Sequence, residues 1–136
     1  MARVRILLAD DHKEMRDRVV RVLENEFQML DAVADGQALL EAACELKPDL
    51  CLVDISMPVL NGFEVAARLK KSGSKAKIVF LSIHEDLDFA RAAYDAGASA
   101  YVVKRRLASD LSKAIRAALA GHTFTSSMVV AHGESA

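Results

Sequence analysis

The chain has 136 residues, 52% of them hydrophobic and 27% charged, a composition typical of one soluble globular domain with a sizeable core. Its 18 basic and 19 acidic residues give a net charge of -1, which excludes a strong overall attraction to nucleic acid or to an anionic membrane. No apolar run approaches the roughly 20 residues of a membrane span and no signal peptide is recognisable, so we expect a cytoplasmic protein that does not enter the membrane.

Short apolar runs and helical periods alternate along the chain. Strands are predicted, in chain order, over Val4–Ala9, Met29–Ala34, Leu50–Val53, Ile78–Leu81 and Ala100–Val103. Helices are predicted between and after them, over Lys13–Glu26, Gln37–Leu46, Gly62–Lys71, Leu87–Ala96 and Leu107–Ala120. Five successive strand–helix units predict a parallel sheet with helices on both faces.

The periodic pattern stops at Gly121, a residue suited to closing a helix. Residues 122–136 are short of apolar periodicity and read as a tail or an interdomain linker. The predicted organisation is therefore one domain over residues 1–121, followed by this tail.

The two cysteines, Cys44 and Cys51, lie in a predicted helix and a predicted strand. Their separation matches no common metal-ligand spacing. We interpret them as small apolar residues of a reducing compartment rather than as a redox pair or half of a metal site.

Polar residues stand where the predicted strands end. Asp10-Asp11 follow the first strand, Asp54 the third, Ser82 the fourth and Lys104 the fifth. Sheets of this class bind ligands beyond the carboxyl ends of their strands, which would bring these side chains together. Buried carboxylates are costly, but a shared divalent cation would offset their repulsion, and Mg²⁺ suits a few carboxylates with water and phosphate.

Such a set is suited to phosphoryl chemistry. A carboxylate can attack a phosphoryl group and form an acyl phosphate. This transfer needs positioning and charge neutralisation, which a cation held by Asp11 and Asp54 would supply. Lys104 would add a point charge and Ser82 a hydroxyl donor.

These residues resemble the receiver domain of two-component response regulators. The similarity rests on Asp10-Asp11, Val53-Asp54-Ile55-Ser56-Met57-Pro58 with Asn61-Gly62, Leu81-Ser82, Tyr101 and Lys104, in this order on alternating strands and helices. It covers residues 4 to about 121. The resemblance implies a flavodoxin-like (βα)5 fold, a three-layer α/β sandwich with a parallel five-stranded sheet of order 2-1-3-4-5.

The resemblance implies that Asp54 is the phosphoacceptor and that the donor is a phosphohistidine of a sensor histidine kinase. It implies that Mg²⁺ binds Asp11, Asp54 and the Ser56 carbonyl, with Asp10 acting largely through water. Ser82 and Lys104 would contact the phosphoryl group. Tyr101 would be the switch, turning inward when Ser82 moves.

Two positions depart from the family pattern, and a third lies beside them. Arg105 follows Lys104 where proline is frequent, so we expect a differently shaped loop without a cis bond. Ile83 stands after Ser82 where a small residue is common, and His84 comes next, near the mouth of the site. Both could affect the lifetime of the phosphorylated state.

Each residue of the set also has a more ordinary interpretation. Asp54 could cap a helix or a turn, and Asp11 or His12 could cap the first helix. Ser82 could be an ordinary strand-end hydroxyl, Lys104 a solvated lysine and Tyr101 a half-buried aromatic of a strand. His12 and His84 are interpreted as exposed loop residues rather than metal ligands.

Three other functions compete with the phosphorylation switch. An aspartyl-phosphate phosphohydrolase of the haloacid dehalogenase type would use magnesium and a strand-end Asp, but normally has a second Asp where this chain has Ser56. A nucleotide-binding flavodoxin-like protein would need a glycine-rich loop where Asp10 to Lys13 stand. A degenerate receiver would bind partners without phosphorylation, which the intact acids argue against.

The region from Leu111 to Phe124 is similar to receivers that precede a LuxR-type helix-turn-helix effector. Either an excised receiver or a stand-alone one is compatible with the sequence. We favour the excised receiver, whose transcriptional output, and any DNA binding, would belong to a part outside this chain. A homodimer formed on phosphorylation is a further expectation.

Overall fold

The structure is a computed structural model that describes residues 3–127. A parallel sheet of order β2-β1-β3-β4-β5-β6 forms its centre. The strands are β1 Arg5–Ala9, β2 Gln28–Val33, β3 Leu50–Asp54, β4 Lys77–Ser82, β5 Ala100–Val103 and β6 Phe124–Thr125. The helices are α1 Lys13–Leu23, α2 Gly36–Leu46, α3 Gly62–Lys71, α4 Leu87–Asp95 and α5 Leu107–Leu119, with a short 3-10 turn over Lys104–Arg106.

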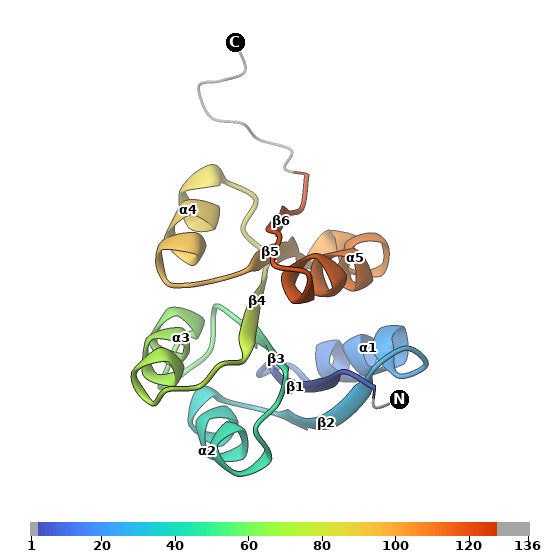
Figure 1. The fold of residues 1–136 in the computed structure, drawn as a ribbon. Coiled ribbons are helices and arrows are strands. Elements are labelled where there is room, and N and C mark those ends of the chain that lie inside the picture. Colours follow the sequence, from blue (N-terminus) through green and yellow to red (C-terminus); the bar gives the residue numbers. More distant parts are fainter. Residues whose placement is uncertain (1–2, 128–136) are drawn as a thin grey trace.

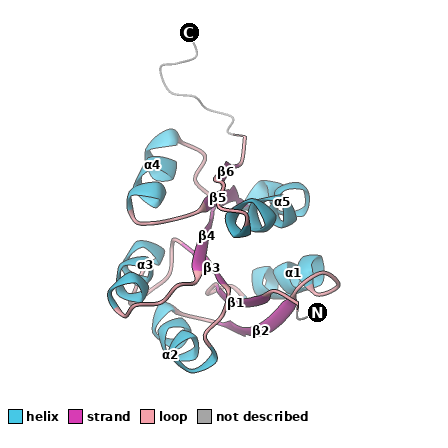
Figure 2. Ribbon diagram, viewed as in Figure 1, coloured by secondary structure: helices cyan, strands magenta, loops and turns pink. Residues whose placement is uncertain are grey.

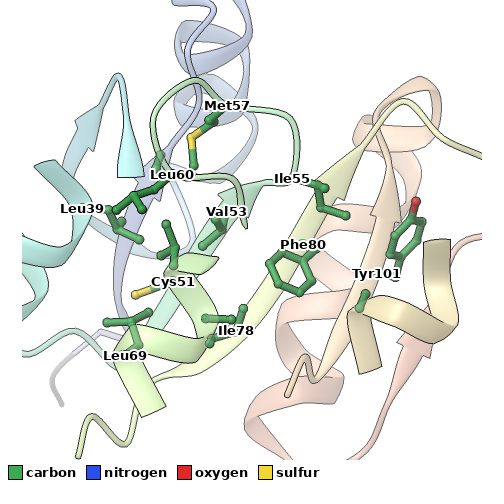
Figure 3. Packing of buried hydrophobic residues seen from close by; sticks show 14 of the residues in the cluster. Leu39, Cys51, Val53, Ile55, Met57, Leu60, Leu69, Ile78, Phe80 and Tyr101 are labelled. Atoms are coloured by element: carbon green, nitrogen blue, oxygen red, sulfur yellow. The ribbon is translucent and has the colours of Figure 1, made fainter. Parts of the chain in front are cut away.

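Helices cover both faces of the sheet. In Figure 1, α2, α3 and α4 lie on one side of the strands and α1 and α5 on the other. The core divides accordingly, because alternate strand residues point to opposite faces. One cluster joins strand residues such as Cys51 and Ile78 to Leu39 of α2 and Leu69 of α3 (Figure 3).

The second cluster lies under α1 and α5. It contains the intervening strand residues, among them Leu8 and Leu52, together with Leu23 of α1 and Leu111 of α5. The central strand β3 is buried along its whole length, from Leu50 to Asp54. A charged strand end at Asp54 is therefore inside the molecule and needs specific partners.

Side-chain caps set the start of three helices. Asp35 accepts a hydrogen bond from Ala38 N–H at the start of α2, and Asp86 accepts one from Phe89 N–H at the start of α4. At α3, Asn61 and Glu64 form a reciprocal capping box. These caps agree with the predicted helix starts within one residue.

Every strand and helix predicted from the sequence is present, and the strand order 2-1-3-4-5 is confirmed (Figure 2). The first helix ends at Leu23 rather than at Glu26, because the chain turns there to bury Phe27. The expectation of five strands is corrected to six, since β6 pairs with β5. A two-residue strand has no periodicity from which it could be predicted.

The strand β6 lies in the segment interpreted as a tail. Residues 124–126 are joined to the sheet, and residues 128–136 of that segment lie outside the described residues. The division of the chain at residue 121 stays a prediction.

Candidate functional site

The register of the sheet brings the predicted site residues to one edge. Ala9 is level with Val53, Asp54 with Leu81, and Ser82 with Val103. Asp10, Asp54, Ser82 and Lys104 therefore stand at the carboxyl ends of four neighbouring strands. Each is buried, with 0%, 2%, 1% and 8% of its surface exposed, respectively.

The ammonium group of Lys104 bridges the two buried carboxylates. Lys104 Nζ lies 2.9 Å from Asp10 Oδ2 and 3.3 Å from Asp54 Oδ1. The interpretation of Lys104 as a solvated lysine is therefore wrong. One cation facing two buried carboxylates leaves an excess of negative charge, which favours binding of a further cation.

Asp54 is held in an environment that disfavours its charged form. Burial, opposed by Lys104 and reinforced by Asp10, raises the pKa of Asp54 from 3.8 to about 6. The N–H of Ser56 donates a hydrogen bond of 3.2 Å to Asp54 Oδ1. The carboxylate is thus ionised at neutral pH but poorly compensated, a state that a bound cation would relieve.

Four residues gather possible metal-ligand atoms within 4.8 Å of one another: Asp10, Asp11, His12 and Asp54. Asp11 Oδ1 is buried and accepts no hydrogen bond of good geometry, although His12 Nδ1 lies 3.1 Å away. Asp10 Oδ2 is paired with the Lys104 ammonium at 2.9 Å. Carboxylate oxygens gathered in this way, with Asp11 Oδ1 buried and accepting no hydrogen bond of good geometry, fit a magnesium ion.

The residues at the start of α1 leave Asp11 free for such a role. His12 is the N-cap residue of α1 and makes no side-chain capping bond, so Asp11 does not cap the helix. The sequence predicted His12 to be an exposed loop residue or a cap of the first helix, and it occupies the N-cap position. It is 72% exposed at the side chain, as expected, but it also adjoins the acidic cluster, which its position after Asp11 could have suggested.

A glycine allows α3 to begin against the end of β3. A Cβ atom at Gly62 would lie 2.8 Å from Ile55 Cα and 2.9 Å from Asp54 O, closer than side-chain atoms pack. Gly62 N–H donates a hydrogen bond to Ile55 O at 2.8 Å. This close approach shapes the loop that carries Ser56, whose proposed carbonyl contact with a metal stays a prediction.

Ser82 and Tyr101 are linked through His84. Ser82 Oγ accepts a hydrogen bond from His84 N–H at 3.0 Å, and the Tyr101 hydroxyl donates one to His84 O at 2.8 Å. The Tyr101 side chain is fully buried, so it is not a half-buried aromatic. The role of Tyr101 as the switch that turns inward when Ser82 moves stays a prediction.

An ion pair between Arg105 and Glu85 joins two loops around the site, and no pattern in the sequence predicts it. Arg105 donates two hydrogen bonds to Glu85, at 2.9 and 2.7 Å, and so ties the loop after β5 to the loop after β4. No cis peptide bond occurs in the described chain, as expected for Arg105 in place of proline. Beside them, Ile83 is 69% exposed and the His84 ring stacks on Phe89 at 3.8 Å.

A cavity of about 710 Å³ lies elsewhere, between α2 and α3. Residues preceding β3 and β4, including Pro48 and Ala76, line it, so it opens at the opposite end of the sheet from Asp54. It contains no carboxylate and none of the predicted site residues. Its lining includes Cys44, which is an exposed free thiol, whereas Cys51 is a buried one.

The fold and the site together define a class of protein. A doubly wound parallel sheet carries a buried Asp at the end of its central strand, beside paired acids and a lysine. Comparison with known families agrees with this class: residues 6–116 match the family described as the response regulator receiver domain. The chain belongs to this family.

Individual relatives support the assignment. The response regulator GacA of Pseudomonas viridiflava is 31% identical over 128 residues, which are 93% of this chain and 60% of that protein. The transcriptional regulatory protein DegU of Brevibacillus brevis is 32% identical, over 90% of this chain and 52% of that protein. This chain therefore spans only about half to three fifths of these two relatives.

A crystal structure of a LuxR-family two-component response regulator from Aurantimonas sp. SI85-9A1 superposes with a TM-score of 0.85. The two chains are 30% identical, and the superposition covers 90% of this chain and 89% of the Aurantimonas chain.

Among residues 3–127, no helix has both the length and the apolar character needed to cross a bilayer.

Proposed function

We propose that this chain is the phosphoacceptor domain of a two-component system and that Asp54 is its phosphorylation site. The observation that carries the proposal is the convergence of Asp54, Asp10 and Lys104, with contacts of 2.9 and 3.3 Å at the end of buried strands. A solvated aspartate would not need this arrangement, because water stabilises its charge.

The reaction follows from the groups present. A carboxylate oxygen of Asp54 attacks the phosphorus of a phosphohistidine, forming an O–P bond as the N–P bond breaks. The electron pair stays on the departing imidazole nitrogen, which takes up a proton. Lys104 and the Ser82 hydroxyl stabilise the negative oxygens of the transferred group.

Magnesium is the cation that we assign to the acidic cluster, with Asp11 and Asp54 as direct ligands, the Ser56 carbonyl as a third and Asp10 acting through water. When bound, the ion would neutralise part of the negative charge of the phosphoryl group. The support is the gathering of carboxylate oxygens of Asp10, Asp11 and Asp54 within 4.8 Å of one another, with Asp11 Oδ1 buried and accepting no hydrogen bond of good geometry.

The phosphohydrolase alternative is not favoured. A general acid would be needed two residues after Asp54, and Ser56 stands there. The family to which the chain belongs consists of signalling domains, and the relatives named above are regulators. We infer a cytoplasmic location, a sensor histidine kinase as donor, formation of a homodimer on phosphorylation, and a DNA-binding output in a part of the protein outside this chain.

Chemical trapping tests the phosphorylation site. The protein is incubated with Mg²⁺ and acetyl phosphate or a phosphoramidate, the acyl phosphate is reduced with borohydride, and the modified residue is located by peptide mass spectrometry. We expect modification at Asp54, its loss in Asp54→Asn and its retention in Asp31→Asn, which changes an exposed carboxylate of β2. Label that persists in Asp54→Asn would refute the assignment.

A further inference from the structure

Residues 124–126 are held on the sheet by more than strand pairing. The Tyr94 hydroxyl of α4 donates a hydrogen bond to Phe124 O at 2.7 Å and lies 2.6 Å from Thr125 Oγ1. Ser126 N–H donates to Tyr101 O at 2.9 Å. The segment therefore connects α4 to β5, and Figure 1 shows β6 at the end of the sheet between α4 and α5.

Ser126 is the most constrained residue of this segment. It is only 2% exposed, although it lies at the edge of the sheet. Its hydroxyl oxygen accepts a hydrogen bond from Val103 N–H at 3.0 Å, and its side chain also hydrogen-bonds Asp110 of α5. A buried hydroxyl with partners on both β5 and α5 has a specific docked position, unlike a residue of a loose linker.

The groups that hold this segment are also adjacent to the candidate phosphorylation site. Tyr101, which accepts from Ser126, donates its hydroxyl proton to His84 O, two residues after Ser82. Val103, which donates to Ser126, directly precedes Lys104. The helix α4, which carries Tyr94, begins three residues after His84.

We propose that residues 124–126 are the output element of this domain, docked on β5 when Asp54 is unmodified and released when Asp54 is phosphorylated. The inference rests on the proposed function. New phosphoryl oxygens attract the Ser82 hydroxyl and the Lys104 ammonium, which breaks the Ser82–His84 hydrogen bond and moves the loop that leads into α4. The hydrogen bond from the Tyr94 hydroxyl to Phe124 O and the one from Ser126 N–H to Tyr101 O both require one relative position of α4 and β5. A shift between these two elements therefore weakens the docking of residues 124–126.

Amide hydrogen exchange measured by NMR, with and without Mg²⁺ and the phosphoryl mimic beryllofluoride, tests this coupling. We expect the Ser126 and Val103 amides to exchange at least fivefold faster with the mimic, the lower end of usual allosteric couplings. Amides of β1, such as Leu8, serve as the reference and should not change. Unchanged or slower exchange at Ser126, with resonances of Ser82 and His84 shifted, would overturn the inference while leaving the proposed function intact.

A lack of any beryllofluoride-dependent shift near Asp54 would overturn the proposed function and this inference together.

Variants give a second readout, because coupling between two sites is reciprocal. Ser126→Ala and Tyr94→Phe loosen the docking, so half-saturating beryllofluoride concentrations should fall at least threefold. Ser127→Ala, a matched change at the exposed neighbour, should bind like the wild type. Wild-type affinity in both loosened variants would contradict the proposal.

Discussion

Replacing Asp54 with asparagine should stabilise the metal-free domain at neutral pH. The pKa of Asp54 rises from 3.8 to about 6 on folding, chiefly through burial. The folded state therefore retains the Asp54 proton at pH values where the unfolded chain has lost it. The free energy of unfolding consequently falls as pH rises from about 4 to about 6 and stays low above that range.

The magnitude follows from the same pKa change. One pKa unit corresponds to about 1.36 kcal/mol, so the ionised carboxylate lowers the free energy of unfolding by up to about 3 kcal/mol. Asparagine is neutral at every pH and keeps a similar shape. Asp54→Asn should therefore gain up to about 3 kcal/mol above pH 6, and this gain should shrink toward zero as pH falls to about 4.

Urea unfolding in EDTA between pH 4.5 and 8 measures this difference, with Asp31→Asn as the control for removal of an exposed carboxylate. Lys104→Met supplies a contrast, because it leaves Asp10 and Asp54 buried without their ammonium partner and should cost roughly 3 kcal/mol or more at pH 8. A variant Asp54→Asn that is no more stable than wild type at pH 8 would refute the reasoning.

Three further predictions concern the metal, a strained loop and the thiols. Millimolar Mg²⁺ should raise the melting temperature of the wild type but not of Asp11→Ala, since ligands that bind only the folded state stabilise it; equal melting temperatures with and without Mg²⁺ in the wild type would remove the metal site. Val59→Gly should raise the free energy of unfolding by about 1 kcal/mol in the same urea assay, because the 86% exposed Val59 has φ of 69°, a conformation that is costly for a β-branched residue; a loss of stability would show that no strain is stored there. Cys44 should react rapidly with Ellman's reagent in the folded protein, whereas Cys51, whose pKa burial raises to about 12, should react only after unfolding; two fast thiols would contradict the buried position of Cys51.

Local patterns in the sequence were sufficient to predict most of the fold. Alternating apolar runs and helical periods located the five main strands and the helices, because burial on one or both faces imposes these periods. The polar residues that end the strands were recognisable for the same reason, since a carboxylate such as Asp54 directly after a buried strand is costly without a function. Their convergence followed from the rule that parallel strands present their carboxyl ends at one edge.

The tertiary structure alone decided the features that depend on contacts between distant residues. The buried position of Tyr101, the pairing of Arg105 with Glu85 and the docking of Ser126 each join segments with no shared local pattern. Hydrogen bonds and ion pairs form wherever geometry brings donors and acceptors together, and they leave no periodic trace in the sequence. The two-residue strand β6 exists for this reason: the free edge of β5, Tyr94 and Asp110 hold it, and its own residues do not predict it.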